Sequence, residues 1–146
     1  MILVKENRLK LLTKDTDYAV RAIVNLARNT EGYRSSRKIA LEEGIPLQFL
    51  RRILQKLTKE GLVVSREGVH GGVRLNAQPG DIRVSDIIKI FQGDIELSEC
   101  MFRKRLCSQR ATCVLRARIK TIEQMVTREF EKVTIATLVK DIGGQQ

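Results

Sequence analysis

Three cysteines are the residues of this sequence with the most distinctive chemistry. Cys100, Cys107 and Cys113 occur within the stretch 96–113, with six and then five residues between them. Thiolates are soft ligands, so three of them on one short basic segment favour an iron–sulfur cluster or zinc over hard cations. Structural zinc sites usually have more closely spaced cysteine pairs. The wide spacing, on a stretch without a regular apolar period, therefore favours a larger polynuclear cluster.

Two other uses of the cysteines remain open from the residues alone. Free cysteine is often a buried apolar residue or a reactive thiol, and such cysteines need no metal. A cysteine nucleophile would need a base close by. The only histidine, His70, falls in a predicted turn, and no second catalytic constellation is visible. The sequence therefore argues against an enzyme.

The composition indicates a protein that binds a polyanion. The 146 residues suffice for one domain, or for a small domain with an appended dimerisation element. A net charge of +10 and a pI near 10.0 on a moderately apolar chain point to nucleic acid. Aromatic residues for base stacking make up only 4% and tryptophan is absent, so duplex DNA is favoured over single strands or RNA.

The predicted compartment is the cytoplasm. No apolar run approaches the length that spans a membrane, so no membrane partner is expected. The opening residues MILVKENRLK carry charges too close together for a signal peptide. In the cytoplasm three cysteines, an odd number, are not expected to form structural disulfides.

Two successive helical patterns predict a helix-turn-helix. A short amphipathic run over 38–43 is interrupted by Gly44, and Pro46 suits the first position of a longer helix. Two helices joined by a short turn that contains glycine are typical of this motif. The longer helix has one apolar stripe at three- and four-residue steps, formed by Leu47, Leu50, Ile53, Leu54 and Leu57.

A β-hairpin pattern follows directly. Gly61 stands where the longer helix should end. The runs 62–64 and 73–75 are strand-like, and the glycine-rich segment 68–72 between them is a turn. The hairpin extends the helix-turn-helix to a winged helix.

Cationic and polar side chains of this module are candidates for DNA contacts. Residues early on the second helix of such a motif reach base edges in the major groove, whereas flanking cations contact phosphates. The alternative is a helical hairpin whose charges are merely solvated. The base-edge candidates are Gln48, Arg51 and Arg52, and the phosphate candidates are Arg37, Lys56 and Ser65.

Four further helical patterns complete the chain. Each has apolar residues at helical spacing, and three of the four also have a side chain able to cap the first turn. The expected helices are one that follows the cap Thr13, one over 84–91 capped by Ser85 or Asp81, one over 114–133, and one over 135–142 capped by Thr134.

The long pattern over 114–133 predicts a dimerisation element. It is longer than a small winged helix needs for its core, and its stripe suits packing against a second copy. Symmetric dimers of this kind bind palindromic sites. Alternatively, the helix completes a monomer core. The predicted fold is mainly α with a small β-wing, organised as a winged helix-turn-helix over 11–80 followed by a cluster-binding loop at 93–113 and dimerisation helices within 81–142.

Several segments carry a family resemblance. The sequences LTKDTDYAVR at 12–21, GIPLQFL at 44–50 and GLVVS at 61–65 are followed by glycines at 68, 71 and 72. Together they resemble the Rrf-type winged-helix transcription regulators, the iron–sulfur family of IscR, NsrR and RirA. The three cysteines fall between a short helix and a long one, where that family has its cluster loop. The resemblance covers the chain from Leu11 to Ile142.

The resemblance implies a homodimer whose long helices cross, with a 4Fe–4S or 2Fe–2S cluster near the dimer interface. The state of the cluster would set affinity for a palindromic operator, and the regulator is expected to be a repressor. Nitric oxide, oxygen or loss of iron would then change DNA binding. The alternative within the family is a cluster-free regulator that senses thiol oxidation or a small molecule.

The resemblance also suggests the cluster ligands. Cys100, Cys107 and Cys113 match the three cluster cysteines. In IscR-like members a histidine three residues after the last cysteine completes the site, but here that residue is Arg116, which cannot ligate. In NsrR-like members an aspartate of the opening helix reaches the partner's cluster, and Asp17 stands at the matching place. Its alternative role is a plain charge in the first turn of a helix.

The wing departs from the family pattern. Many members have an arginine directly before the first wing glycine, and that arginine reaches the minor groove. Here Glu67 occupies this place and Arg66 comes one residue earlier. Arg66 or His70 could take over the contact, or the wing could touch phosphate alone.

Overall fold

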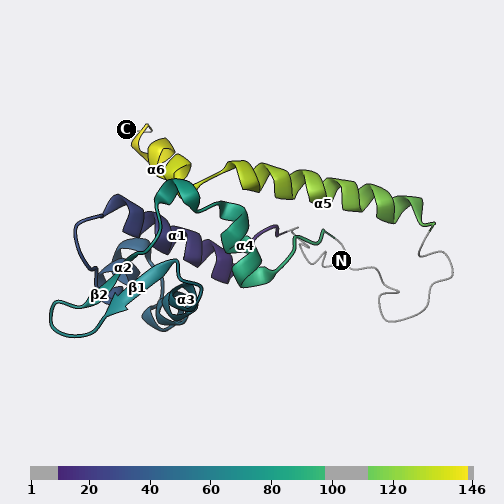
Figure 1. Cartoon of the computed structure of the whole chain (residues 1–146). Coiled ribbons are helices and arrows are strands. Elements are labelled where there is room, and N and C mark those ends of the chain that lie inside the picture. Colours follow the sequence, from purple (N-terminus) through teal and green to yellow (C-terminus); the bar gives the residue numbers. More distant parts are fainter. Residues whose placement is uncertain (1–9, 98–111, 145–146) are drawn as a thin grey trace, which may run out of the picture.

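Six α-helices and a two-stranded antiparallel sheet form the described part of the chain (Figure 1). The structure is a computed structural model that describes residues 10–97 and 112–144. It confirms the predicted mainly α fold with a small β-wing. In chain order the elements are α1 (Lys14–Arg28), α2 (Ser36–Glu43), α3 (Leu47–Lys59), β1 (Val63–Arg66), β2 (Gly72–Leu75), the 3-10 turn η1 (Pro79–Asp81), α4 (Val84–Gln92), α5 (Val114–Lys132) and α6 (Ile135–Gly143).

Two of the predicted helix caps are confirmed. Thr13 precedes α1, and its hydroxyl accepts a hydrogen bond from the Thr16 amide at 3.3 Å. Thr134 precedes α6 in the same way and accepts from the Thr137 amide at 3.1 Å. Each bond satisfies one of the amides that the first helical turn leaves without a partner.

The predicted caps of α4, Ser85 and Asp81, are wrong. The helix begins at Val84, so Ser85 already lies inside the first turn. The residue before the helix is Arg83, whose amide donates to the Asp86 carboxylate at 3.2 Å. Helix boundaries are difficult to predict to within one residue. Because α4 begins one residue before Ser85, the side-chain acceptor near its start is Asp86 and not Ser85.

The predicted boundary residues of the helix-turn-helix lie at or next to the ends of α2 and α3. Gly44 ends α2 with φ +61°. Pro46 is the residue before α3 rather than its first helical residue. At the end of α3, Gly61 has φ +77°, and the following Leu62 amide donates to the Leu57 carbonyl at 3.0 Å. A left-handed residue after a helix permits this bond and favours glycine there.

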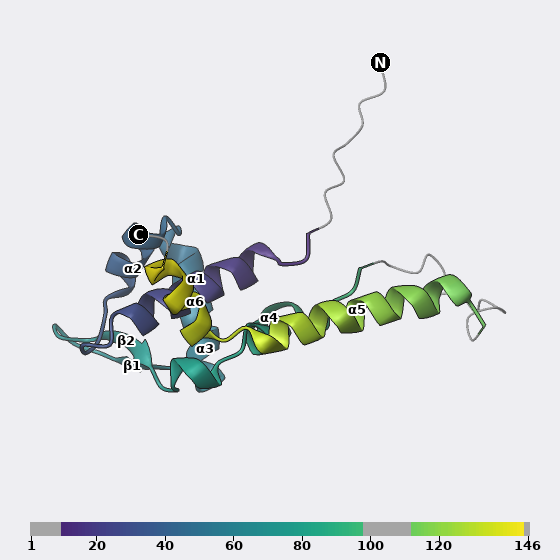
Figure 2. The ribbon, with the colours of Figure 1, turned by 90° about the horizontal axis from the view of Figure 1, so that it is seen from above.

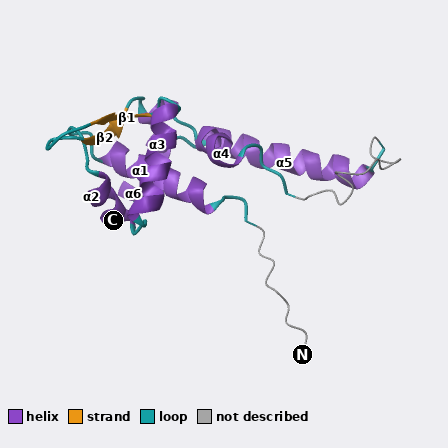
Figure 3. Cartoon of the chain, turned by 90° about the horizontal axis from the view of Figure 1, so that it is seen from below, coloured by secondary structure: helices purple, strands orange, loops and turns teal. Residues whose placement is uncertain are grey.

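α1 lies at the centre of the main core. It packs against α2, α3, α4 and α6, and Figure 3 shows these helices gathered beside the two strands. Residues from both sides of position 80 share this core, and the predicted division of the chain at that position stays a prediction. The largest fully buried side chains include Ile23, Ile39, Leu50, Ile53, Leu57, Ile82, Ile87 and Ile135.

α5 extends away from this body (Figure 2). None of its residues is buried in the described chain. Only its second half is anchored, because Val126 and Phe130 pack against a small separate cluster of Val84, Ile88 and Ile95. Large apolar side chains of α5 therefore face solvent, namely Val114, Leu115, Ile122 and Met125. No described helix combines the length and the apolar character needed to cross a lipid bilayer.

Candidate functional site

The exposed face of α3 carries all four predicted contact residues of this helix. The buried stripe of Leu50, Ile53, Leu54 and Leu57 fixes the helix against the core. Because residues three and four apart share a helix face, the polar positions opposite this stripe form one continuous surface. Its exposed side chains are Gln48, Arg51, Arg52, Gln55, Lys56 and Lys59. The predicted contact residues did not include Gln55 and Lys59. Their spacing of seven residues from Gln48 and Arg52 places them on the same face.

Arg52 is held by the start of α1. Its Nη2 atom donates to both carboxylate oxygens of Asp15, at 2.9 Å and 3.0 Å. Its guanidinium carbon also lies 5.2 Å from the centre of the Phe49 ring. In the sequence, Asp15 is only an acidic residue two positions after the predicted cap Thr13. Asp15 and Arg52 are 37 residues apart in the sequence, so the spacing of neighbouring residues could not predict their contact.

Lys56 lies toward α4. Its ammonium nitrogen is 5.0 Å from the centre of the Phe91 ring, within range of a cation–π contact. The Lys56 ammonium group therefore lies at the side of α3 that faces α4. This position suits a phosphate contact better than a base contact.

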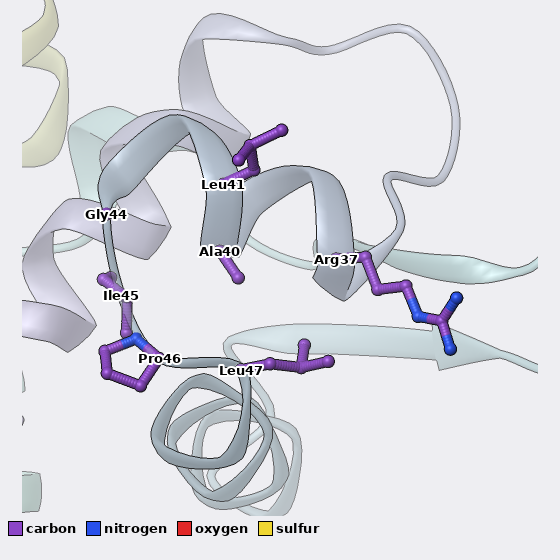
Figure 4. A pocket seen from close by; sticks show the side chains of 7 residues that line it. All are labelled: Arg37, Ala40, Leu41, Gly44, Ile45, Pro46 and Leu47. Carbon is purple, nitrogen blue, oxygen red and sulfur yellow. The ribbon is translucent and has the colours of Figure 1, made fainter.

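Arg37 stands beside the start of α3. A shallow apolar pocket of about 410 Å³ lies between α2 and α3, and its lining includes Arg37, Pro46 and Leu47 (Figure 4). The exposed Arg37 side chain lies at the rim, together with Leu41, which is 84% exposed. An exposed cation at the start of α2 is well placed for the phosphate contact expected of it.

The wing is the antiparallel pair β1–β2, with Val63 opposite Leu75 and Arg66 opposite Gly72. β1 begins one residue later than predicted and continues through Ser65 to Arg66. Ser65, Arg66 and His70 are exposed, and Arg66 donates to the His70 carbonyl at 3.2 Å. The structure thus brings two of the predicted wing residues together at the tip side of the hairpin.

Tyr33 lies between two wing arginines. The guanidinium carbons of Arg66 and Arg74 are 4.8 Å and 5.1 Å from the centre of its ring. An arginine side chain stacked on an aromatic ring keeps its charge but loses conformational freedom. Sequence reasoning missed Tyr33 and Arg74, and only the alternation of outward side chains along β2 pointed to Arg74.

The loop before α2 ties the wing to the helices. Arg34 and Val73 exchange two backbone hydrogen bonds, at 2.9 Å and 2.8 Å. The Arg34 side chain forms an ion pair with Glu42 of α2, which also accepts from Asn25 of α1 at 2.9 Å. The hydrogen bond from Asn25, and then the one from Arg34, lowers the pKa of the Glu42 carboxyl below its ordinary value of 4.5.

The lowered pKa predicts a pH-dependent stability. A carboxyl with a depressed pKa in the folded state adds stability above its unfolded pKa, and this contribution disappears as the pH falls through the folded pKa. We expect Glu42→Gln to lower the melting temperature slightly at pH 7 and to reduce its decline below pH 4.5. Melting curves of wild type and variant from about pH 3 to pH 7 measure this difference. Parallel curves would contradict it.

Cys113 is a free, exposed thiol at the residue before α5. Cys100 and Cys107 lie outside the described residues. Within residues 10–97 and 112–144, no three histidine, cysteine or acidic side chains gather as metal ligands would. The N-terminal end of α5, where Cys113 precedes the helix, projects from the body of the molecule and lies away from α1 in both views (Figures 1 and 2).

Asp17 presents its carboxylate at the surface of the first turn of α1. The side chain is 54% exposed, and one oxygen lies 3.5 Å from Arg21. Arg21 in turn lies 3.7 Å from the Glu43 carboxylate and donates to the Glu43 carbonyl at the end of α2. An exposed carboxylate can serve as an oxygen ligand of a metal centre.

Comparison with known proteins gives a consistent result. Residues 12–141 match the Rrf2 family model, described as an iron-dependent transcriptional regulator. Protein aau3 of Rhizobium meliloti is 34% identical over 130 residues, which are 88% of this chain and 84% of that protein. The HTH-type transcriptional regulator NsrR of Bacillus subtilis is 29% identical over 132 residues, 89% of this chain and 90% of NsrR.

Solved structures agree with the winged-helix fold. T. potens IscR superimposes with a TM-score of 0.75 and 26% identity, covering 92% of this chain and 90% of IscR. CymR, the global cysteine regulator of B. subtilis, gives a TM-score of 0.71 and 25% identity, covering 91% of this chain and 98% of CymR. The likeness extends over helices and wing together.

Proposed function

Because this chain belongs to the Rrf2 family of transcriptional regulators, we propose that it binds a palindromic operator in the cytoplasm as a homodimer whose affinity is set by an iron–sulfur cluster. The observation that carries the DNA-binding part is the continuous polar face of α3 beside a wing that bears exposed arginines. Its relatives are DNA-binding transcriptional regulators and not enzymes, so the cysteine-nucleophile alternative is wrong.

In this proposal α3 lies in the major groove. Gln48, Arg51 and Arg52 reach base edges, because glutamine pairs well with adenine and arginine with guanine. The wing residues Arg66 and His70 lie along the adjoining backbone or minor groove. Phosphate contacts come from Lys56 on α3, Arg37 on α2 and Ser65 on β1.

The dimer would form through α5. Its exposed apolar side chains include Leu115, which is 69% exposed, and Met125, which is 60% exposed. Packing two copies of this helix would remove that apolar surface from water. A two-fold axis that crosses the two helices would bring the start of each α5 toward the partner's winged helix and place two copies of α3 for adjacent half-sites, about one DNA turn apart.

Cys100, Cys107 and Cys113 would hold the cluster together with Asp17 of the partner subunit. A second copy is needed because the start of α5 lies away from α1 within one chain (Figure 1). When bound, such a cluster supplies a centre that reacts with nitric oxide or oxygen and is lost when iron is scarce.

The helix-turn-helix can respond to Asp17 through Arg21. The guanidinium of Arg21 is shared between Asp17 at 3.5 Å and the Glu43 carboxylate at 3.7 Å. If Asp17 is engaged elsewhere, Arg21 keeps its contacts with Glu43 at the end of α2 and with the Tyr18 ring, which lies 5.8 Å from its guanidinium carbon. Loss of the Asp17 contact would therefore change the charge balance at Glu43, the last residue of α2 before the turn into α3.

A cluster-free regulator that senses thiol oxidation or a small molecule is the second candidate. The likeness to CymR, a cysteine regulator by name, and the exposed Cys113 thiol favour it. Iron and sulfide content per chain, measured with an absorption spectrum on protein prepared without oxygen, separates the candidates. A colourless protein without iron would favour the second.

Footprinting tests the proposed control. Duplexes selected by the wild-type protein from a randomised pool serve as operator. We expect protection of two half-sites by the cluster-loaded protein and an altered footprint after nitric oxide treatment or removal of the cluster. Identical protection in all three forms would exclude cluster control, and failure to retard any duplex would exclude the DNA-binding role.

A further inference from the structure

We propose that Asp15 is a positioning residue that orients Arg52 to recognise a guanine in the operator. The inference rests on the proposed function, because it requires α3 to lie in the major groove. It adds a specificity-determining residue that lies on α1, outside the helix-turn-helix. The observation that carries it is the contact between Asp15 and the exposed guanidinium of Arg52.

The geometry holds Arg52 from two sides. Both oxygens of Asp15 accept from Nη2, at 2.9 Å and 3.0 Å. The ring of Phe49, one turn earlier on α3, lies 5.2 Å from the guanidinium carbon. Lys14 of α1 lies 6.0 Å from the same ring, so the start of α1 contacts Phe49 as well. Arg52 is therefore fixed in direction without being buried.

The remaining donors of Arg52 stay available. Its hydrogen bonds in the described part of the chain use Nη2 alone, which leaves the Nη1 hydrogens available to donate to a base acceptor. The guanidinium is also more exposed than its partner, with 60% of the Arg52 side chain accessible against 41% for Asp15. Guanine offers two acceptors, O6 and N7, to an arginine that enters the major groove.

A role in stability explains this pair less well. Exposed ion pairs contribute little to folding, because water screens them and two side chains lose freedom. An arginine that is already oriented loses less freedom when it binds a base, so the same contact can improve recognition. Asp15 is thus expected to act on base preference more than on folding.

The competing explanation is that Asp15 masks the charge of Arg52. A carboxylate on Arg52 could instead withhold the cation from DNA. The two explanations predict different results for removal of the Asp15 carboxylate. Masking predicts tighter binding to every duplex with the same base preference, whereas positioning predicts that the preference at one base pair is weakened.

The test uses full-length protein and duplexes selected by the wild type from a randomised pool, with every base pair of the site substituted in turn. We expect Asp15→Ala to lose about tenfold in discrimination at one G·C pair in each half-site, since a mismatched base pair in a specific site typically costs roughly that factor. Arg52→Ala should lose discrimination at the same pair, and the double variant should lose no more than Arg52→Ala. Asp15→Asn, which keeps one acceptor oxygen, should lie between wild type and Asp15→Ala.

Glu60→Ala is the matched control. Glu60 is an exposed carboxylate at the end of α3, and its removal changes the net charge equally without touching Arg52. It should leave the base preference unchanged. An Asp15→Ala protein that melts like wild type and retains the wild-type preference at every pair would overturn the inference, as would uniformly tighter binding. If wild type retards no duplex, the proposed function itself fails and the inference with it.

Discussion

Replacing Cys100, Cys107 and Cys113 together by alanine is expected to give a colourless protein without iron or sulfide, whose operator affinity no longer responds to nitric oxide or chelators. Thiolates are the ligands that retain such a cluster, and one carboxylate cannot hold it alone. We expect the wild-type response to be lost entirely. Coupling between two sites usually changes affinity by roughly 5–150-fold, so the loss is readily measured by gel retardation.

Asp94→Ala provides the control for the thiol variant. Asp94 is an exposed carboxylate at the start of the predicted cluster loop, and no ligand role is assigned to it. Its removal should leave iron, sulfide and the nitric oxide response intact. A thiol-free variant that binds and releases operator like wild type under every redox condition would contradict cluster control and favour a sensing mode that needs no thiol.

Gly72→Ala is expected to destabilise the fold by about 3 kcal/mol, through strain and a steric clash. Gly72 has φ +145°, and a Cβ atom there would stand 2.3 Å from the Arg34 carbonyl oxygen. Because Arg34 and Val73 exchange two backbone bonds at this point, the clash cannot be relieved without opening the tie between wing and loop. For a chain of this size the melting temperature should fall by roughly 6–12 °C.

Gly80→Ala is the matched control for the wing variant. No atom lies within 4 Å of a Cβ built on Gly80, and its backbone is not left-handed. The substitution should therefore shift the melting temperature little. Gly72→Ala should also weaken operator binding, because Arg66, opposite Gly72, would lose its support. A Gly72→Ala protein with wild-type stability would show that the wing is not anchored at Arg34.

Local patterns predicted the elements of this fold well. The caps Thr13 and Thr134 and the turn glycine Gly44 act through neighbours one turn away, so their roles are visible in the sequence. The predicted caps of α4, Ser85 and Asp81, were wrong because the helix begins at Val84, which places Ser85 inside the first turn and Asp81 before the N-cap residue Arg83. Helix ends are the least determined part of any periodic pattern.

Contacts between distant residues could not be predicted in this way. The Asp15–Arg52 ion pair joins α1 to α3, and Tyr33 stacks with two arginines of the wing. These partners come together only when the helices pack around α1. The predicted ligand and contact residues of the site stay predictions, since they concern a second subunit, a cluster and DNA.

The small anchor of α5 has a mechanical consequence. A helix of 19 residues is about 28 Å long at 1.5 Å per residue, yet only Val126 and Phe130 near its end rest on the Val84, Ile88 and Ile95 cluster. It is a lever whose pivot lies beside the winged helix and whose far end carries Cys113. A small rotation of α5 about this pivot would therefore move Cys113 much farther than the residues that rest on the cluster.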